Sequence, residues 1–456
     1  MLDESRYIDV LGQYPQLKTY NHGTALFPLS DEISRESVVE AFETATAKIV
    51  SKIPWLADQV VHEGKKPGDT GTFGLAPWPS TAPANTLVRV KDCSDVCPTH
   101  DEILKAQGPA SMLDGKEICP VPGFPLTYDE AKIGPAPAVV VQINWIKGGL
   151  LLTFSNQHNV MDATGMFQFI AMLSAVMSGE EIPERAIENG NRDRKTVVPL
   201  LGENEPIRDH SYLRAPPPPQ TPAQPPVAPK APASWAYFRF LKKSIPKVKA
   251  VATDPEGFDK SVPFISSNDA VSAFYWKRLA IARVNNGQDP AAVSKFARAI
   301  DGRTAMGVST EYMGQFVYFS ATWLSYRELV DLPLSTIASK MRKNLNEVNN
   351  EFSVRSYATF IAGVPDKMTL AYGGPFNRET DIGSSSMAQA AVVLKFGILG
   401  VPELIRRPNL APIPGTLYFY PPEGTGDLNL LVCLNKQELE ALKNDPEWGP
   451  CTEFIG

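Results

Sequence analysis

A proline-rich segment in the middle of the chain constrains the fold more than any other feature. Residues 215–232 have the sequence APPPPQTPAQPPVAPKAP. Proline fixes the backbone φ angle and lacks an amide donor, so this segment can form neither a helix interior nor an inner strand. We expect an extended connector; a ligand for a proline-recognition module is the alternative, but folded-looking sequence on both sides favours a spacer. The expected organisation is a domain at 1–214, a linker at 215–232 and a second domain at 233–456.

Apolar periodicity predicts a mixed α/β structure in the first half. Residues 35–53 place Val38, Phe42 and Ile49 at helical spacing, which indicates an amphipathic helix. Residues 138–146 (AVVVQINWI) and 150–154 are β-branched or apolar runs separated by a Gly-Gly turn, which is typical of a β-hairpin. A buried helix is expected over 166–177.

The second half shows the same style. Residues 268–284 are expected to form a helix with Asn268 or Asp269 as its N-cap. Further helices are expected over 334–348 and 437–443, and strands over 316–322, 415–420 and 428–434. The sequence therefore predicts two α/β domains of similar size.

Composition narrows the class of partner. The net charge of −6 and pI of about 5.6 argue against nucleic acid or an anionic membrane as partner. The first residues lack the features of a signal peptide, and the apolar runs are too short to span a bilayer. Five sparse cysteines fit a reducing compartment and lack the spacing of a metal site. We therefore expect a cytoplasmic protein without a bound metal.

One histidine stands where catalytic groups are often found. His158 opens the run HNVMD (residues 158–162), between an expected strand and an expected buried helix. No nucleophile elbow, phosphate loop or metalloprotease motif competes with it. A single base without a protein nucleophile suits direct transfer between two bound substrates. We expect incidental roles for the remaining histidines, which are His22, His62, His100 and His210.

Asp162, four residues after His158, has two interpretations. It caps the following helix by accepting a backbone N–H, or it orients the imidazole as the carboxylate of a triad does. A cap directs its carboxylate into the start of the helix, which favours the structural role.

Several ordered segments resemble one family over nearly the whole chain. The central segment is 141–173, with QINWIKGGLLLTFSNQHNVMDATGMFQFIAML at its core. Others are YPQLKTYNHGTALFPL (14–29), IPWLADQV (53–60), DGR (301–303), YMGQ (312–315), 264–283 and the closing 434–456. Together they resemble the BAHD acyltransferases, and in particular the fungal branch typified by trichothecene 3-O-acetyltransferase.

The resemblance implies two α/β domains similar to chloramphenicol acetyltransferase, with a tunnel at their interface and His158 at its middle. It implies acyl-CoA as cosubstrate, no permanent cofactor, and a monomer. The acyl group, acetyl by default in this branch, would pass to a hydroxyl, or secondarily an amine, of a small secondary metabolite. Asp162 would turn away and support the loop. The alternatives are a condensation or cyclisation in the same tunnel, or a non-catalytic binding protein.

One position departs from the family pattern. The DFGWG motif corresponds here to KFGILG (395–400), with Lys395 in place of an aspartate that would pair with Arg303. Two like charges would repel each other. We expect that Asp301 or Asp381 pairs with the arginine instead, or that Lys395 points to solvent.

The oxyanion and CoA contacts are expected in the second half. Hydroxyls of Ser384, Ser385 and Ser386 are candidates for stabilising the tetrahedral oxyanion. The CoA phosphates need a local basic site, and a solvated basic face is the equal alternative. The candidates for that site are Lys242, Lys243, Lys247, Arg283 and Arg303.

Overall fold

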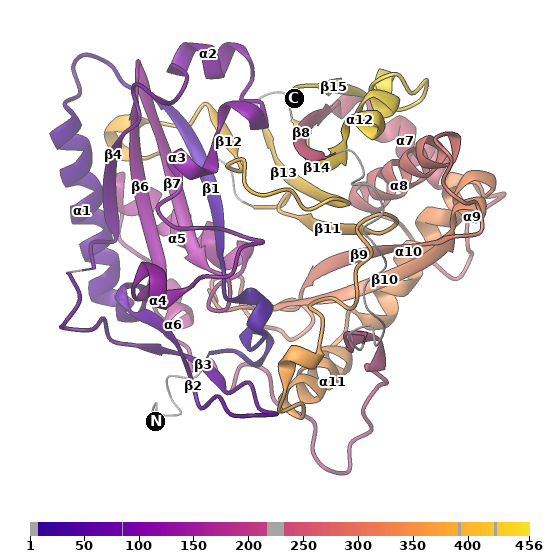
Figure 1. Ribbon diagram of the computed structural model, residues 1–456, viewed down its shortest axis with the longest axis horizontal. Coiled ribbons are helices and arrows are strands. Elements are labelled where there is room, and N and C mark those ends of the chain that lie inside the picture. Colours follow the sequence, from indigo (N-terminus) through magenta and orange to yellow (C-terminus); the bar gives the residue numbers. More distant parts are fainter. Residues whose placement is uncertain (1–7, 84, 217–231, 391–393, 424–425) are drawn as a thin grey trace.

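A computed structural model describes residues 8–83, 85–216, 232–390, 394–423 and 426–456. Two mixed α/β halves lie side by side, the first built mainly from residues before the proline-rich segment and the second from residues after it (Figure 1). The α/β class and the two-domain architecture predicted from the sequence are confirmed. Residues 217–231, most of the expected linker, lie outside the described residues.

The first half is organised around a five-stranded sheet. Its β6–β7 hairpin is the predicted one, turning at Gly148, whose φ of 81° suits glycine. Every residue of these two strands is buried, and most of their side chains are apolar. The polar side chains among them include Gln142 and Asn144, which form hydrogen bonds inside the protein. In order across the sheet, the strands are β12 (Leu404–Arg406), β1 (Tyr20–Pro28), β7 (Gly149–Gln157), β6 (Val139–Ile146) and β4 (Val88–Asp92).

The second half contributes one strand to the sheet of the first half. β12 belongs to the second half by sequence, yet it pairs with β1 at the edge of the first sheet. Nearby, Phe396 packs against Phe27 and Phe154, with ring centroids 5.4 and 6.0 Å apart. A division at the proline-rich segment alone is therefore incomplete, because residues 394–406 contribute to the first core.

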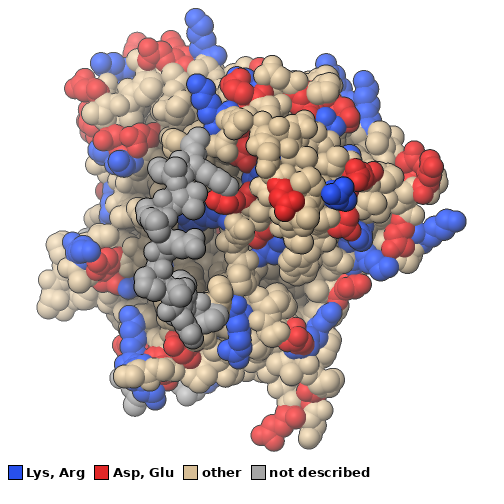
Figure 2. All heavy atoms as spheres, turned by 45° about the vertical axis from the view of Figure 1, so that its right-hand side comes forward, with Lys and Arg blue, Asp and Glu red and all other residues tan. Residues whose placement is uncertain are grey.

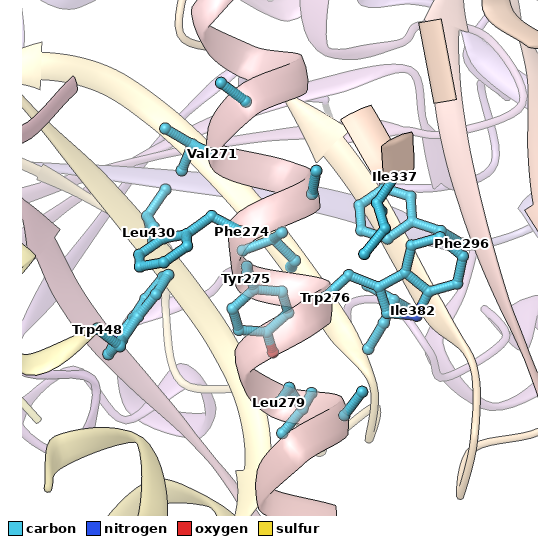
Figure 3. Close-up of a cluster of buried hydrophobic side chains, with 14 of the residues drawn as sticks. Val271, Phe274, Tyr275, Trp276, Leu279, Phe296, Ile337, Ile382, Leu430 and Trp448 are labelled. Carbon is cyan, nitrogen blue, oxygen red and sulfur yellow. The ribbon is translucent and has the colours of Figure 1, made fainter. Parts of the chain in front are cut away.

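The second half is organised around a seven-stranded sheet. Its strands, in order, are β10 (Val317–Ser325), β9 (Val293–Asp301), β11 (Ile382–Ser386), β13 (Thr416–Glu423), β14 (Asp427–Asn435), β8 (Ala233–Phe240) and β15 (Thr452–Phe454). Helix α8 (Ser267–Asn285) packs on this sheet (Figure 3). Trp276 meets Phe296 of β9, with ring centroids 5.4 Å apart, and Phe274 stacks on Trp448.

The N-cap of α8 differs from the prediction. Ser266, not Asn268 or Asp269, caps the helix, and its hydroxyl accepts from the Asp269 amide. Asp269 sits three residues later and closes a capping box by accepting from the Ser266 amide. The helix therefore begins about one residue earlier than predicted.

The remaining elements cover the sheets or connect them. The described residues also form a small sheet of β3 (Thr72–Ala76), β2 (Gln59–Glu63) and β5 (Ala136–Pro137). The other helices are α1 (Arg35–Lys52), α2 (His100–Lys105), α3 (Gly115–Ile118), α4 (Glu130–Ile133), α5 (Ala163–Met177), α6 (Glu184–Gly190), α7 (Ile245–Ala252), α9 (Tyr326–Asp331), α10 (Leu334–Val348), α11 (Glu351–Ala362) and α12 (Lys436–Lys443). A search of the described residues finds no helix with the length and hydropathy to cross a membrane.

Basic and acidic side chains are interspersed on the face of the second half (Figure 2). Such mixing gives little net field at a distance, because opposite charges within a Debye length offset each other. This face therefore offers no extended single-sign patch to a polyanion.

Candidate active site

The loop after β7 positions His158. The His158 amide donates to the Thr19 carbonyl at 2.7 Å, and the Met161 amide donates to the Gln157 carbonyl at 3.2 Å. The Asn159 side chain donates to the carbonyls of Gly12 and Tyr14. The short turn predicted between strand and helix is therefore fixed by backbone partners on both sides.

The His158 ring is half-buried and forms part of a cavity wall. Burial lowers the pKa of His158 below its ordinary value of 6.5, and the nearby charge of Asp162 opposes that shift only in part. Nδ1 is enclosed, which leaves Nε2 as the ring nitrogen with access to the cavity. The ring of Tyr372 meets the imidazole edge-on, with centroids 6.2 Å apart. A neutral imidazole in this position can accept a proton from a bound substrate.

Asp162 is the N-cap of α5, as the preferred interpretation predicted. Its carboxylate accepts from the Gly165 amide at 2.9 Å and from the Phe316 amide at 2.9 Å. It also accepts from Nη1 and Nη2 of Arg303, at 2.8 and 3.0 Å. These contacts fasten the carboxylate to the start of α5 and to the second half, which is the structural role predicted for it.

Arg303 fastens this loop to the second half. Its side chain is fully buried, and it donates to Asp301 and to the carbonyls of Tyr312 and Gly314 as well as to Asp162. At Gly165 a Cβ would lie 2.3 Å from the Met313 carbonyl oxygen, so only glycine allows the first turn of α5 to approach this closely. The second half therefore sets the position of the loop that carries His158.

The departure at Lys395 leaves this network intact. Asp301 pairs with Arg303, and the Lys395 side chain is exposed, so both of the expected solutions occur together. The backbone of Lys395 remains structural, because its carbonyl accepts from Ser174 and Ser178 of the α5 region. The family motif thus differs here at Lys395, whose exposed side chain lies outside the buried network of Arg303.

A cavity of about 430 Å³ opens between the halves beside His158. Its wall is mainly aromatic and aliphatic, and both halves contribute to it. The first half supplies, among others, His22, Phe124, Phe154, Met166 and Ile170, and the second supplies Phe319, Tyr372, Phe376, Tyr418 and Tyr420. A volume and lining of this kind suit a small organic ligand.

The three candidate serines are placed differently. Ser384 and Ser385, in β11, contribute to the cavity wall, whereas Ser386 does not and is exposed. β11 runs parallel to β13, with Ser385 opposite Tyr418. The structure therefore places two of the three candidate serines in the wall of the cavity that contains His158.

The candidate CoA contacts fall into two groups. Lys242, Lys243 and Lys247 are exposed at the beginning of α7. Arg283 is buried and ion-paired with Glu438 at 2.7 Å, and Arg303 is buried in the network already described. Neither arginine is among the described residues of the cavity wall, and both guanidinium groups form ion pairs in the interior.

The sequence analysis did not identify several polar residues of the cavity wall, among them His22, Tyr372 and Arg407. The sequence predicts an incidental role for His22, yet it lies in β1 and in the cavity wall, with Nδ1 2.7 Å from the Ser155 hydroxyl. Its alternation with Tyr20 along an expected strand was the available signal. Within the described residues, no cluster of His, Cys, Asp or Glu side chains has the composition to hold a metal ion.

Comparison with family models defines the class. The model of the Transferase family matches residues 124–448, and that of the trichothecene 3-O-acetyltransferase-like N-terminal domain matches residues 19–176. The first match covers more than half of the chain. The protein belongs to this transferase family, the BAHD acyltransferases.

Individual relatives agree with this class. The chain is 45% identical to the O-acyltransferase pigD of Monascus ruber over 100% of both chains. It is 42% identical to the O-acetyltransferase epaC of Aspergillus niger, covering 100% of this chain and 98% of the relative. The crystal structure of Fusarium sporotrichioides TRI101 complexed with coenzyme A and T-2 superposes with a TM-score of 0.88 at 32% identity, over 99% of each chain. The sequence-based prediction of an acyl-CoA-dependent O-acyltransferase is thereby confirmed.

Proposed function

We propose that this protein transfers an acyl group from acyl-CoA directly to a hydroxyl of a small, largely apolar secondary metabolite, with His158 as general base. One observation carries the assignment: a neutral, loop-fixed imidazole faces a mainly aromatic cavity between the two halves. Such a cavity excludes water from the thioester and favours transfer over hydrolysis.

The mechanism needs no acyl-enzyme. Nε2 of His158 takes the proton of the acceptor hydroxyl as its oxygen attacks the thioester carbonyl. The tetrahedral intermediate develops an oxyanion, for which the Ser384 or Ser385 hydroxyl is the proposed donor. The thiolate of CoA then leaves and recovers the proton from His158. Asp162 keeps the loop in register through Arg303 and takes no proton.

Acetyl is the proposed acyl group and a hydroxyl the proposed acceptor group. Relatives named O-acetyltransferase and O-acyltransferase support oxygen as the acceptor atom, with an amine as the lesser alternative. A cavity wall that one chain supplies from both of its halves supports the proposal that the enzyme is monomeric. The cytoplasmic location stays a prediction from the sequence.

The alternative function, a condensation or cyclisation in the same cavity, had one supporting feature in the sequence. That feature was the lysine at position 395, whose side chain is exposed and absent from the cavity wall. Transfer to a hydroxyl therefore remains the function that the site supports best.

Replacement of the base tests the assignment. His158→Ala should lower acyl transfer by about 10²–10⁴-fold, because the hydroxyl loses its proton acceptor. The assay measures thiol release from acetyl-CoA with alcohol acceptors, and the thermal midpoint shows whether the variant is folded. His62→Ala is a matched control, since His62 lies in the small sheet and outside the cavity wall. A His158→Ala variant with the parent rate would refute the proposal.

A charge reversal tests the proposed CoA site. Changing Lys242 and Lys243 together to Glu should raise the apparent KM for acetyl-CoA several-fold, with a smaller change in kcat, because exposed charges mainly affect association with the phosphates. The effect should diminish at high ionic strength. An unchanged KM at low salt would remove both lysines from the site.

A further inference from the structure

Arg407 is a buried cation without an acidic partner. It follows β12, it is only 7% exposed, and it forms part of the cavity wall. Its Nη2 donates to the Phe124 carbonyl at 3.1 Å, while Nη1 has no hydrogen-bond partner. Within the described part of the chain, no carboxylate forms an ion pair with it.

Such a group is costly to bury alone. A guanidinium removed from water loses hydration that only an anion or several acceptor oxygens replace well. Buried polar atoms are nearly always satisfied, so an atom of a cavity wall without a protein partner is available to a bound group. His22 is close to Arg407 but does not balance its charge. Burial and the Arg407 charge lower the pKa of His22 to about 3, so its ring stays neutral.

Aromatic residues of the second half hold the guanidinium in place, in addition to the Phe124 carbonyl of the first half. The guanidinium stacks over the Trp235 ring, 4.5 Å from the ring centroid, and lies 5.8 Å from that of Tyr418. The Arg407 amide donates to the Tyr237 hydroxyl at 2.7 Å. Aromatic stacking stabilises the cation and fixes the plane of its donors without using them. This arrangement leaves donor capacity for a ligand.

The described residues of the cavity wall carry a net positive charge. Among the described lining residues the cations are Arg407 and the exposed Arg378, and the single carboxylate is Asp162, which Arg303 already neutralises. An otherwise apolar wall transmits the field of Arg407 more strongly than water would. The cavity therefore favours a ligand with negative charge over a neutral one of the same shape.

CoA is a poor candidate for the negative charge that would pair with Arg407. Its anionic groups are the phosphates at the nucleotide end, whereas the arm that enters a cavity to deliver the thioester is neutral. The exposed Lys242, Lys243 and Lys247, in and just before α7, remain the proposed partners of the phosphates. The acceptor is then the source of negative charge at Arg407.

We propose that Arg407 forms an anion-recognising subsite for the acceptor, and that the acceptor is an alcohol which also carries an anionic oxygen, as a carboxylate or an ionised enol. This inference rests on the proposed function, and it specifies the class of acceptor. The anionic oxygen would approach the guanidinium while the hydroxyl faces His158, so Arg407 selects the acceptor and orients it.

Binding of two matched probes tests the subsite without turnover. 2-Naphthoate and 2-naphthamide have the same flat apolar body and differ in charge. Isothermal titration calorimetry on the full chain should give about tenfold or tighter binding of naphthoate, as expected for a charge-assisted hydrogen bond. In Arg407→Gln this preference should vanish while affinity for the amide stays within about twofold. Arg407→Lys should retain part of the preference, because it keeps the charge and loses the planar fork.

Controls separate the possible sources of an effect. Arg327→Gln removes the same charge from an exposed position in α9 and should leave the preference intact. Saturating CoA should not displace naphthoate; displacement, or a loss of CoA affinity in Arg407→Gln, would assign Arg407 to the cosubstrate and overturn the proposal. Equal or unmeasurable binding of both probes to the parent protein would also overturn it. Acyl transfer itself is tested by His158→Ala, so failure of one proposal is distinguishable from failure of the other.

Discussion

Arg303 and Arg407 are both buried arginines near the interface of the two halves, and their surroundings are opposite. Arg303 is fully enclosed and contacts two carboxylates and two backbone carbonyls. Arg407 contacts one carbonyl and two aromatic rings, and one of its nitrogens has no partner. The first arrangement is complete without a ligand and the second is not. Full pairing is thus consistent with a structural role for Arg303, and incomplete pairing is consistent with the proposed role of Arg407 in binding the acceptor.

The largest effect should come from breaking the complete network. Arg303→Gln leaves Asp162 buried beside fewer donors and should lower the free energy of unfolding by about 3–5 kcal/mol. Urea denaturation followed by tryptophan fluorescence measures this loss. Acyl transfer should fall as well, since the loop that carries His158 loses its anchor in the second half. A change below about 1 kcal/mol would show that the network contributes little and would contradict the comparison.

The same substitution at Arg407 should behave differently. Arg407→Gln removes a stacked cation and one hydrogen bond, and it also removes an unpaired buried charge, so these terms largely offset each other. We expect the free energy of unfolding to change by less than about 1 kcal/mol. The measurement is the urea series used for Arg303→Gln, with Arg327→Gln as the exposed reference. A loss as large as that for Arg303→Gln would make Arg407 a structural residue.

The smallest effect concerns pH. Since burial lowers the pKa of His158, the neutral base persists below pH 6.5, and kcat/KM should decline only at more acidic pH. Asp162 raises this pKa, so Asp162→Asn should move the acid limb further toward low pH in whatever activity remains. The pH profile of acetyl transfer measures both. An acid limb above 6.5, or a shift toward neutral pH in the variant, would contradict the assigned environment.

Local features of the site could be predicted from the sequence. His158 follows an apolar strand and precedes a capped helix, and both elements depend on neighbouring residues. The cap by Asp162 was predicted for the same reason. Its second partner was not, because Arg303 is distant in the sequence and no local pattern joins them.

The residues of the cavity wall could not be predicted, because they depend on packing between elements that are far apart in the sequence. Lys242 and Lys247 are basic and exposed, as composition suggested, whereas Arg283 is equally basic and buried against Glu438. Charge alone cannot separate these cases, since burial depends on packing between elements far apart. The same holds for Arg407, whose importance lies in a missing partner, and a missing contact has no signature in the chain.

The contribution of β12 to the first sheet also limits where the chain can be divided into fragments. β12 covers the edge of β1, which otherwise presents unpaired amide and carbonyl groups beside an apolar core. A fragment ending before the proline-rich segment would expose that edge and invite intermolecular pairing. Chimaeras of this chain with a relative should therefore keep residues 394–406 with the first half, even though those residues follow most of the second half in the gene.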